Sequence, residues 1–390
     1  MTVPASRVRP RTARRVVPLL LVVGLLAPLG VLFQQSWRLT DDDRSLAARE
    51  RLGVAYLRIL GPVTDALVDA QSAAVAGRSA TGAALTDAVE EVARVDARVG
   101  AELRTQERWA GLRAKLEALR DRPPTDPEAA FTAYGEVTDL LLDLHRKVRE
   151  SSGLIRDPES DSFFLQDAAG RQLPEAMVAA GRLTDLATLA ARRSPDDRSR
   201  TLAQLAALRV AALTPAGTLV DDLRAAVDRS ESADLGGNVL TPLDTYQRAV
   251  EALAAASAPT RTGTLDAAPV AGARLDAHAA AEQLQPVILA ELDALLAARV
   301  DRLDRDRWLV VAAAGLGVLL LAVLAGVLIA AARRARRAAA EARRARKAED
   351  DRTAEAPTWQ PGSGEPRPLQ PAGRAGDPDA ARWGPADAAR

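Results

Sequence analysis

Residue types that do covalent or metal chemistry are scarce in this sequence. Cysteine is absent, which excludes thiol nucleophiles, disulfides, iron–sulfur clusters and zinc ribbons. His145 and His278 are the only histidines, so any metal site would have to consist mainly of carboxylates, and no Asp/Glu/Gly loop has calcium-binding spacing. We therefore expect no metal and no cofactor, and we expect both histidines to be surface or interhelical residues rather than catalysts.

Motifs typical of enzymes are also missing. The sequence contains no G-x-S-x-G turn, no P-loop and no dinucleotide-binding glycine pattern. Its many carboxylates are accompanied by arginines, as on the solvated faces of helices. The 52 basic and 52 acidic residues cancel, so no excess charge favours nucleic acid as a partner. An enzyme is the least favoured class of protein.

One segment combines several residues suited to binding or to helix capping. It reads GLIRDPESDSFFLQDAAGRQLP from Gly153 to Pro174. Asp157 is a suitable N-cap, with Pro158 at the first helical position, where its missing N–H costs nothing. Asp167 and Arg171 have the spacing of an ion pair on one helix face. The candidate site residues of this segment are Asp157, Pro158, Asp161, Ser162, Phe163, Phe164, Asp167 and Arg171.

Two interpretations of this segment are open. In the structural interpretation, Asp157 and Pro158 cap a helix, and the two phenylalanines pack into a bundle core. In the other, the aromatic pair and the neighbouring carboxylates contact a ligand directly. Arg156, Arg171 and Arg182 each offer a guanidinium fork that matches a carboxylate, but arginine is so abundant that no single one stands out.

The elements that position these residues are predicted to be helices. Hydrophobic residues make up 48% of the chain and aromatic residues only 3%, and Ala and Leu favour helix because they lose little rotamer freedom there. Apolar residues recur with helical spacing, and alternating β-branched runs with hairpin turns are absent. Clusters of Gly, Pro and Ser separate predicted helices at about 38–76, 83–121, 127–155, 158–193, 196–230 and 242–257, and a last one from about 265 onwards.

Two arrangements of these helices fit their lengths. The longest would reach about 60 Å, which is more than one compact bundle needs. Two stacked four-helix bundles that share the first and last helices would accommodate this length, and one elongated bundle with an insertion is the alternative. The fold class is all-α in either case.

Two uncharged apolar segments predict transmembrane helices. Residues 16–33 are just long enough to span a bilayer, and residues 309–332 form a longer span. A cleaved signal peptide is the alternative for the first, but no small-x-small cleavage pattern follows it. Trp37 and Trp308 suit the headgroup level, and arginines precede the first span and follow the second. This pattern predicts a cell-membrane protein with both termini in the cytoplasm and residues 34–308 outside it.

The spans define the predicted organisation of the chain. Gly315, Gly317 and Gly326 would let the second span pack closely on another helix, so we expect a homodimer, although Gly and Ala are common in any such helix. The basic stretch after this span is expected to lie on anionic lipids or to dock a cytoplasmic protein. The predicted parts are a cytoplasmic basic N-terminus (1–15), two spans (16–33 and 309–332), an extracytoplasmic helical domain (34–308), a basic juxtamembrane helix (333–350) and a disordered tail (351–390).

The segment at 153–174 resembles part of a known group of sensing domains. Its D-P-x-x-D-S-F-F-L-x-D pattern is similar to a stretch of the extracytoplasmic helical sensing domains of bacterial methyl-accepting chemotaxis proteins and sensor histidine kinases, including the helical bimodular type. The similar positions are Asp157, Pro158, Asp161, Ser162, Phe163, Phe164, Leu165 and Asp167, followed by Leu173 and Pro174. The resemblance implies a domain that senses small organic ligands or other stimuli and passes a small helix displacement through the membrane.

The resemblance does not extend to an output module. After residue 332 the sequence has no histidine to accept a phosphoryl group, no Gly-rich ATP-binding pattern, no long heptad repeat and no paired amphipathic helices. We therefore expect a sensor-like signalling protein that detects a small ligand or a protein and acts through a partner in trans. A non-signalling envelope scaffold, anchored by the same two spans, is the alternative.

Overall fold

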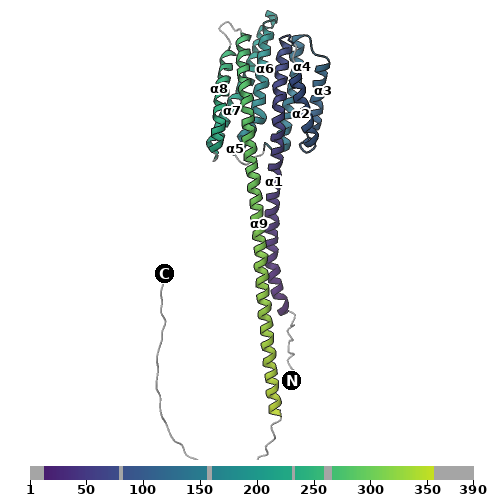
Figure 1. Cartoon of the computed structure of the whole chain (residues 1–390), viewed down its shortest axis with the longest axis vertical. Coiled ribbons are helices and arrows are strands. Elements are labelled where there is room, and N and C mark those ends of the chain that lie inside the picture. Colours follow the sequence, from purple (N-terminus) through teal and green to yellow (C-terminus); the bar gives the residue numbers. More distant parts are fainter. Residues whose placement is uncertain (1–12, 79–81, 156–159, 231–232, 259–265, 355–390) are drawn as a thin grey trace, which may run out of the picture. The chain divides into compact units, whose positions relative to one another are not determined.

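The computed structural model describes residues 13–78, 82–155, 160–230, 233–258 and 266–354, and almost all of them are helical (Figure 1). No strand occurs in these ranges, which confirms the all-α fold class. The α-helices are α1 (Ala13–Val75), α2 (Ala83–Val99), α3 (Gln106–Asp121), α4 (Pro127–Ser152), α5 (Ser160–Asp167), α6 (Leu173–Ala190), α7 (Arg198–Arg229), α8 (Ala233–Ala256) and α9 (Ala267–Ala354). A π-helical turn at Ala168–Gln172 joins α5 to α6, and a 3₁₀ turn at Pro195–Asp197 precedes α7.

The chain divides into two compact units, Met1–Leu319 and Leu320–Arg390, and the helical bundle lies in the first. Within it, α1 packs against α2, α4 and α6, while α7 packs against α6 and α8. Every α-helix of the bundle contributes to one continuous core, which includes Leu57, Val92, Leu112, Leu141, Leu165, Leu173, Leu219, Leu235 and Leu284.

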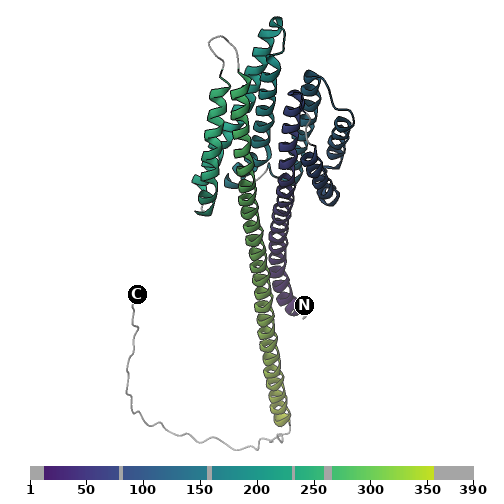
Figure 2. The same cartoon turned by 45° about the horizontal axis from the view of Figure 1, so that its top comes forward.

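Of the two predicted arrangements, the stacked one does not fit, because the bundle helices lie alongside one another rather than end to end (Figures 1 and 2). Stacking was suggested by predicted helices of nearly 40 residues, of which 38–76 is part of the 63-residue α1 and 83–121 is broken into α2 and α3; α9 has 88 residues. Helices α4 and α7 have only 26 and 32 residues, so each crosses the bundle once. The extra length of α1 and α9 lies in their apolar and basic segments instead.

The second predicted helix, at 83–121, is interrupted. Helix α2 ends at Val99, α3 begins at Gln106, and Arg104 between them has a φ of 51°. The carboxylate of Asp96, at the end of α2, accepts hydrogen bonds from the Tyr56 hydroxyl (2.9 Å) and from Thr105 Oγ1 (2.6 Å). This buried carboxylate stabilises the turn, and its partner Tyr56 belongs to α1, so the break depends on a tertiary contact.

Helix α8 begins earlier than predicted. Gly236-Gly237 and Pro242 predicted a loop over 231–242, yet α8 runs through all three residues. Leu235, Val239 and Tyr246 on this helix are at most 2% exposed. Burial of such side chains contributes about 1.5–3 kcal/mol each, which offsets helix-propensity costs of about 1 kcal/mol per Gly and about 3 kcal/mol for Pro.

Helix α4 matches its predicted start and ends three residues early. Asp126 caps it by accepting a hydrogen bond from the Ala129 N–H at 2.9 Å. Gly153 follows its last turn with a φ of 96°, and a Cβ there would lie 2.5 Å from Leu46 Cδ1. Glycine at this position therefore ends α4 and lets the chain pass close to α1.

Two of the described helices, α7 and α9, are long and apolar enough to cross a membrane. Helix α7 buries Leu205, Leu219 and Leu223 in the bundle, as a core helix does. No residue of 309–332 in α9 is buried, and apolar side chains such as Leu320 are 60% exposed. The predicted span at 16–33 lies within α1, but most of its side chains fall outside the described part of the structure, and it stays a prediction.

Candidate functional site

The first part of the predicted site cannot be compared with the structure. Asp157 and Pro158 lie outside the described residues, and so does the side chain of Asp161, whose backbone is in α5. Their capping and binding roles therefore stay predictions. The remaining candidate residues are described and lie on α5 and the π-helical turn.

The aromatic pair lies partly at the surface. The rings of Phe163 and Phe164 meet edge to face with centroids 5.9 Å apart. Phe163 is 40% exposed, whereas Phe164 packs against the core and has the Arg229 guanidinium 4.9 Å from its ring centroid. Ser162 beside them is buried. The predicted packing of the pair into the core thus holds for Phe164 and not for Phe163.

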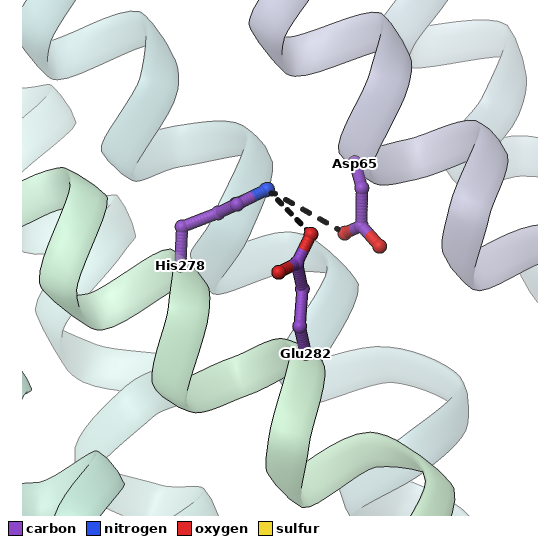
Figure 3. Close-up of side chains that lie close together, drawn as sticks. All are labelled: Asp65, His278 and Glu282. Carbon is purple, nitrogen blue, oxygen red and sulfur yellow. Dashed lines mark ion pairs between the residues drawn. The ribbon is translucent and has the colours of Figure 1, made fainter. Parts of the chain in front are cut away.

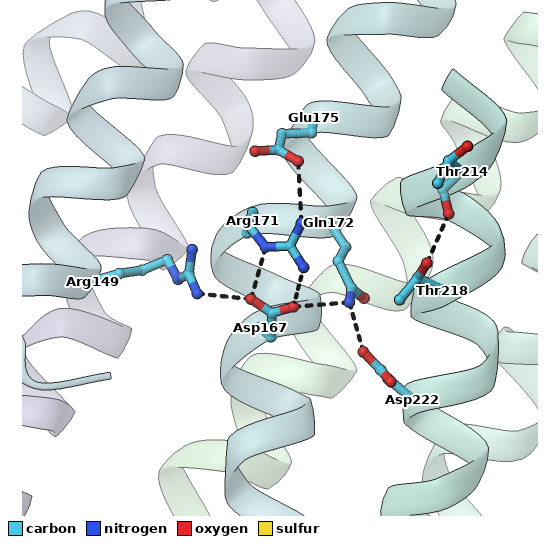
Figure 4. A network of polar contacts seen from close by, with 8 residues as sticks. All are labelled: Arg149, Asp167, Arg171, Gln172, Glu175, Thr214, Thr218 and Asp222. Carbon is cyan, nitrogen blue, oxygen red and sulfur yellow. Dashed lines mark hydrogen bonds and ion pairs between the residues drawn. The ribbon is translucent and has the colours of Figure 1, made fainter. Parts of the chain in front are cut away.

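Asp167 is the centre of a buried polar network (Figure 4). Its carboxylate accepts hydrogen bonds from Arg149 Nη2 at 2.7 Å and from Arg171 at 2.9 and 2.5 Å, so the ion pair inferred from the spacing is present. The Gln172 side-chain amide donates to Asp167 at 2.8 Å and to Asp222 at 2.6 Å. The network therefore connects α4, the π-helical turn and α7.

Local geometry explains how two arginines reach one carboxylate. Asp167, Arg171 and Gln172 lie in or beside the π-helical turn, whose wider winding directs all three side chains to one side. Gly170 has no side chain to block α4, since a Cβ there would lie 2.5 Å from Arg149 Cδ. Burial lowers the pKa of Arg149, and the charge of Asp167 opposes that effect. Because both oxygens of Asp167 already accept hydrogen bonds from the protein, this arrangement suits a structural clamp.

Ion pairs connect α1 with α9 along most of the bundle. At the end nearest the apolar segments, the Arg307 guanidinium lies 3.7 Å from the ring centroid of Trp37 and 3.3 Å from Asp41 Oδ1. These contacts place Trp37 and Trp308, both predicted at the headgroup level, around one cavity of about 480 Å³. Further pairs are Arg44–Asp304 (2.6 Å), Glu50–Arg299 (3.7 Å), Arg51–Asp293 (2.8 Å) and Asp69–Arg274 (3.1 Å).

A cavity of about 690 Å³ opens where α1 ends, between α1, α2, α3 and α4. Its apolar wall includes Leu85, Leu116 and Tyr134, and Arg78 and Glu90 also line it. This volume lies in the range of about 300–1,000 Å³ that small-molecule sites occupy, and an apolar wall with a few charged groups is their usual composition.

His145 is an interhelical residue of the core and not a surface residue, and both positions were expected as possibilities from the sequence. It is 1% exposed, and its Nε2 lies 3.3 Å from Thr64 Oγ1 of α1. Burial lowers the pKa of His145 to about 3, with a smaller effect from the charge of Arg149. The ring is therefore neutral at physiological pH.

His278 lies in a cluster with two carboxylates (Figure 3). Its Nε2 is 3.8 Å from Asp65 Oδ1 and 3.6 Å from Glu282 Oε1. Burial lowers the pKa of His278. Burial, and then the charges of Glu282 and Asp69, raise the pKa of Asp65 to about 7. Sequence analysis missed this cluster because Asp65 is near the start of the chain and His278 near its end; only the His278–Glu282 spacing gave a local signal.

Comparisons with protein-family models, curated proteins and solved structures found no match to this chain.

Substitution of Asp167 by Asn is predicted to lower the free energy of unfolding by about 3–5 kcal/mol, because it leaves the buried Arg149 without a carboxylate. Denaturant unfolding of the full-length chain in detergent measures the change. The control is Asp143→Asn, which removes an exposed pair with Arg146 and should cost less than about 1 kcal/mol. Equal, small effects of both variants would contradict a structural role for the Asp167 network.

Neutral burial of His145 predicts an acid-sensitive stability. Its folded-state pKa of about 3 lies below the ordinary histidine pKa of 6.5, so mainly the unfolded state binds a proton between these values. The contribution of His145 is fully present above pH 6.5 and falls by about 1.4 kcal/mol per pH unit below it.

His145→Gln keeps a polar atom near Thr64 but does not titrate. Between pH 7 and pH 5, the wild type should lose about 2 kcal/mol more stability than this variant. The comparison is necessary because Asp65 and Asp185, whose folded-state pKa values are raised to about 7 and about 6, stabilise the fold as the pH falls. Parallel pH profiles of the two proteins would show that His145 is not the cause.

Proposed function

We propose that this chain is a sensor-like membrane protein whose helical bundle detects a ligand and transmits a displacement of α1 relative to α9. The observation that carries the proposal is the direct pairing of these two helices. Both contribute to the bundle core, ion pairs connect them, and both continue into apolar segments beyond the bundle. A change in how the bundle packs would therefore reach both apolar segments.

The composition of α9 supports insertion in a membrane. Residues 309–332 form an uncharged helical segment with no buried side chain, and exposure of that much apolar surface to water is unfavourable. Arginines follow this segment directly, which favours a cytoplasmic location for residues after 332. In this proposal residues 16–33 form the other span and residues 34–308 lie outside the cytoplasm.

The contacts at the bundle end of these segments suit coupling at a membrane surface. Trp37 and Trp308 carry amphipathic rings that favour the headgroup region. The Arg307 guanidinium lies over the Trp37 ring and beside Asp41, so α1 and α9 are held together at this level. Helix shifts of about 1–2 Å, which are typical of such switches, would change these contacts.

The proposed ligand site is the cavity where α1 ends. Its mixed lining suits a small organic molecule with an apolar body and a charged or polar end. Ala70 and Ala74 of α1 line it, so a bound ligand would contact the helix that leads to the membrane. The similarity of residues 157–167 to the sensing domains of chemotaxis receptors and sensor kinases favours the same role. A signal would act through a partner in trans, and no enzymatic activity is proposed.

Membrane topology can be tested with single cysteines, because the chain has none of its own. Ala110 on α3 and Ala342 in the basic part of α9 are both exposed. We expect a membrane-impermeant maleimide to label the A110C variant in spheroplasts and the A342C variant only after lysis. Labelling of A342C in spheroplasts, or failure of A110C to react, would contradict the proposed orientation.

Ligand binding can be tested by thermal unfolding of the full-length chain in detergent, with organic acids, amino acids and inorganic anions as probes. A compound that binds the cavity should raise Tm by several degrees at saturation. Leu85→Trp, which fills the cavity, should abolish this rise, whereas Leu240→Trp on the exposed face of α8 should preserve it. A rise retained in L85W would exclude this cavity, and no rise with any compound would favour a protein partner or the envelope-scaffold alternative.

A further inference from the structure

Three potential metal-binding atoms converge between α1 and α9. They are Oδ1 of Asp65, Nε2 of His278 and a carboxylate oxygen of Glu282, and all lie within 4.8 Å of one another. Figure 3 shows the His278 ring on α9 directed toward both carboxylates. His278 and Glu282 are four residues apart on one helix, so they lie on one face, and Asp65 approaches from α1.

The convergence is unusual because two carboxylates face one imidazole nitrogen at 3.6 and 3.8 Å, beyond hydrogen-bond distance. His278 is 8% exposed, and its Nε2 has no hydrogen-bond partner among the described residues. Oδ1 of Asp65 is likewise buried without one in this part of the chain. Buried polar atoms without hydrogen-bond partners are destabilising, and a bound cation removes that cost.

The charges around the cluster favour a cation as well. Asp69 lies one turn from Asp65 on α1, and Arg274 lies one turn from His278 on α9 and pairs with Asp69 at 3.1 Å. Among the described residues, the ion pairs of Asp65 and Glu282 include no arginine or lysine and involve only the buried His278 ring. A divalent ion would balance both carboxylates.

We propose that Asp65, His278 and Glu282 bind one divalent transition-metal ion, for which zinc is the best fit. Zinc accepts both imidazole nitrogen and carboxylate oxygen as ligands, whereas calcium and magnesium favour oxygen ligands alone. Zinc–ligand bonds of about 2.0–2.2 Å place neighbouring donor atoms about 3.3 Å apart, so the observed 3.6 and 3.8 Å need only small side-chain movements. Three protein ligands leave one position for water or an external ligand.

Metal binding at this place would join α1 to α9. Asp65 is on the first helix and the other two ligands are on the last, so the ion would fix the relative position of the two helices. This site does not depend on the proposed sensing role, because it requires only the folded bundle.

The experiment is a zinc titration of the full-length chain in detergent after removal of metals, in competition with a chromophoric chelator. We expect one zinc ion per chain and a rise in Tm when zinc is present. His278→Gln should weaken the affinity at least tenfold and abolish the rise in Tm. Glu282→Gln should also weaken binding, and since the Glu282 side chain is 49% exposed, this variant is expected to fold normally.

The matched control is His145→Gln, which removes the other buried histidine. The side-chain partner of that histidine is Thr64 and not a pair of carboxylates. The zinc affinity of this variant should equal that of the wild type. Replacement of zinc by cobalt should give absorption bands that are lost in H278Q and kept in H145Q. Absence of stoichiometric zinc binding in the wild type, or equal affinity in the wild type, H278Q and E282Q, would overturn the proposal.

Discussion

Helices α1 and α9 share the core of the bundle, and ion pairs join them along its length. Leu60 and Leu67 of α1 and Leu284 and Ile288 of α9 are fully buried in the same core. Since these helices come first and last, the chain between them has to leave α1, build the bundle and return to α9. Helices α2, α4 and α6 pack on α1, and α3 packs on α4 and α2. Helices α6, α7, α8 and α9 together line a small cavity of the bundle.

Buried polar groups restrict which packing is possible. In a core of Leu, Val and Ala with few aromatic rings, side-chain shapes differ little, so packing alone favours no single register between neighbouring helices. Asp167 can accept hydrogen bonds from Arg149, Arg171 and Gln172 only in one position of α4 relative to the π-helical turn. Asp96 can accept one from Tyr56 only in one position of α1 relative to α2. A shift by one helical turn would leave these carboxylates buried without partners, at a cost of several kcal/mol.

Local signals in the sequence predicted local features. The all-α class, the start of α4 at Pro127 and the Asp167–Arg171 pair all depend on spacings of a few residues. Features set by distant parts of the chain could not be predicted this way. The break between α2 and α3 depends on Tyr56 of α1, and α8 continues through Gly236-Gly237 because the core buries its neighbours. Arg149 joins the site from another helix, and no spacing connects Asp65 with His278.

The contacts between α1 and α9 differ in how strongly they resist movement. Arg44–Asp304 and Arg51–Asp293 are exposed by a third or more, and such pairs contribute at most about 1 kcal/mol, so they can exchange partners at little cost. Glu50, Arg299, Asp65 and His278 are more buried, so a movement there has to rearrange groups that are largely shielded from water. Asp65 and His278 lie on α1 and α9 between the cavity where α1 ends and the contacts of Trp37 and Arg307. An ion bound by the cluster would join the two helices between these two regions.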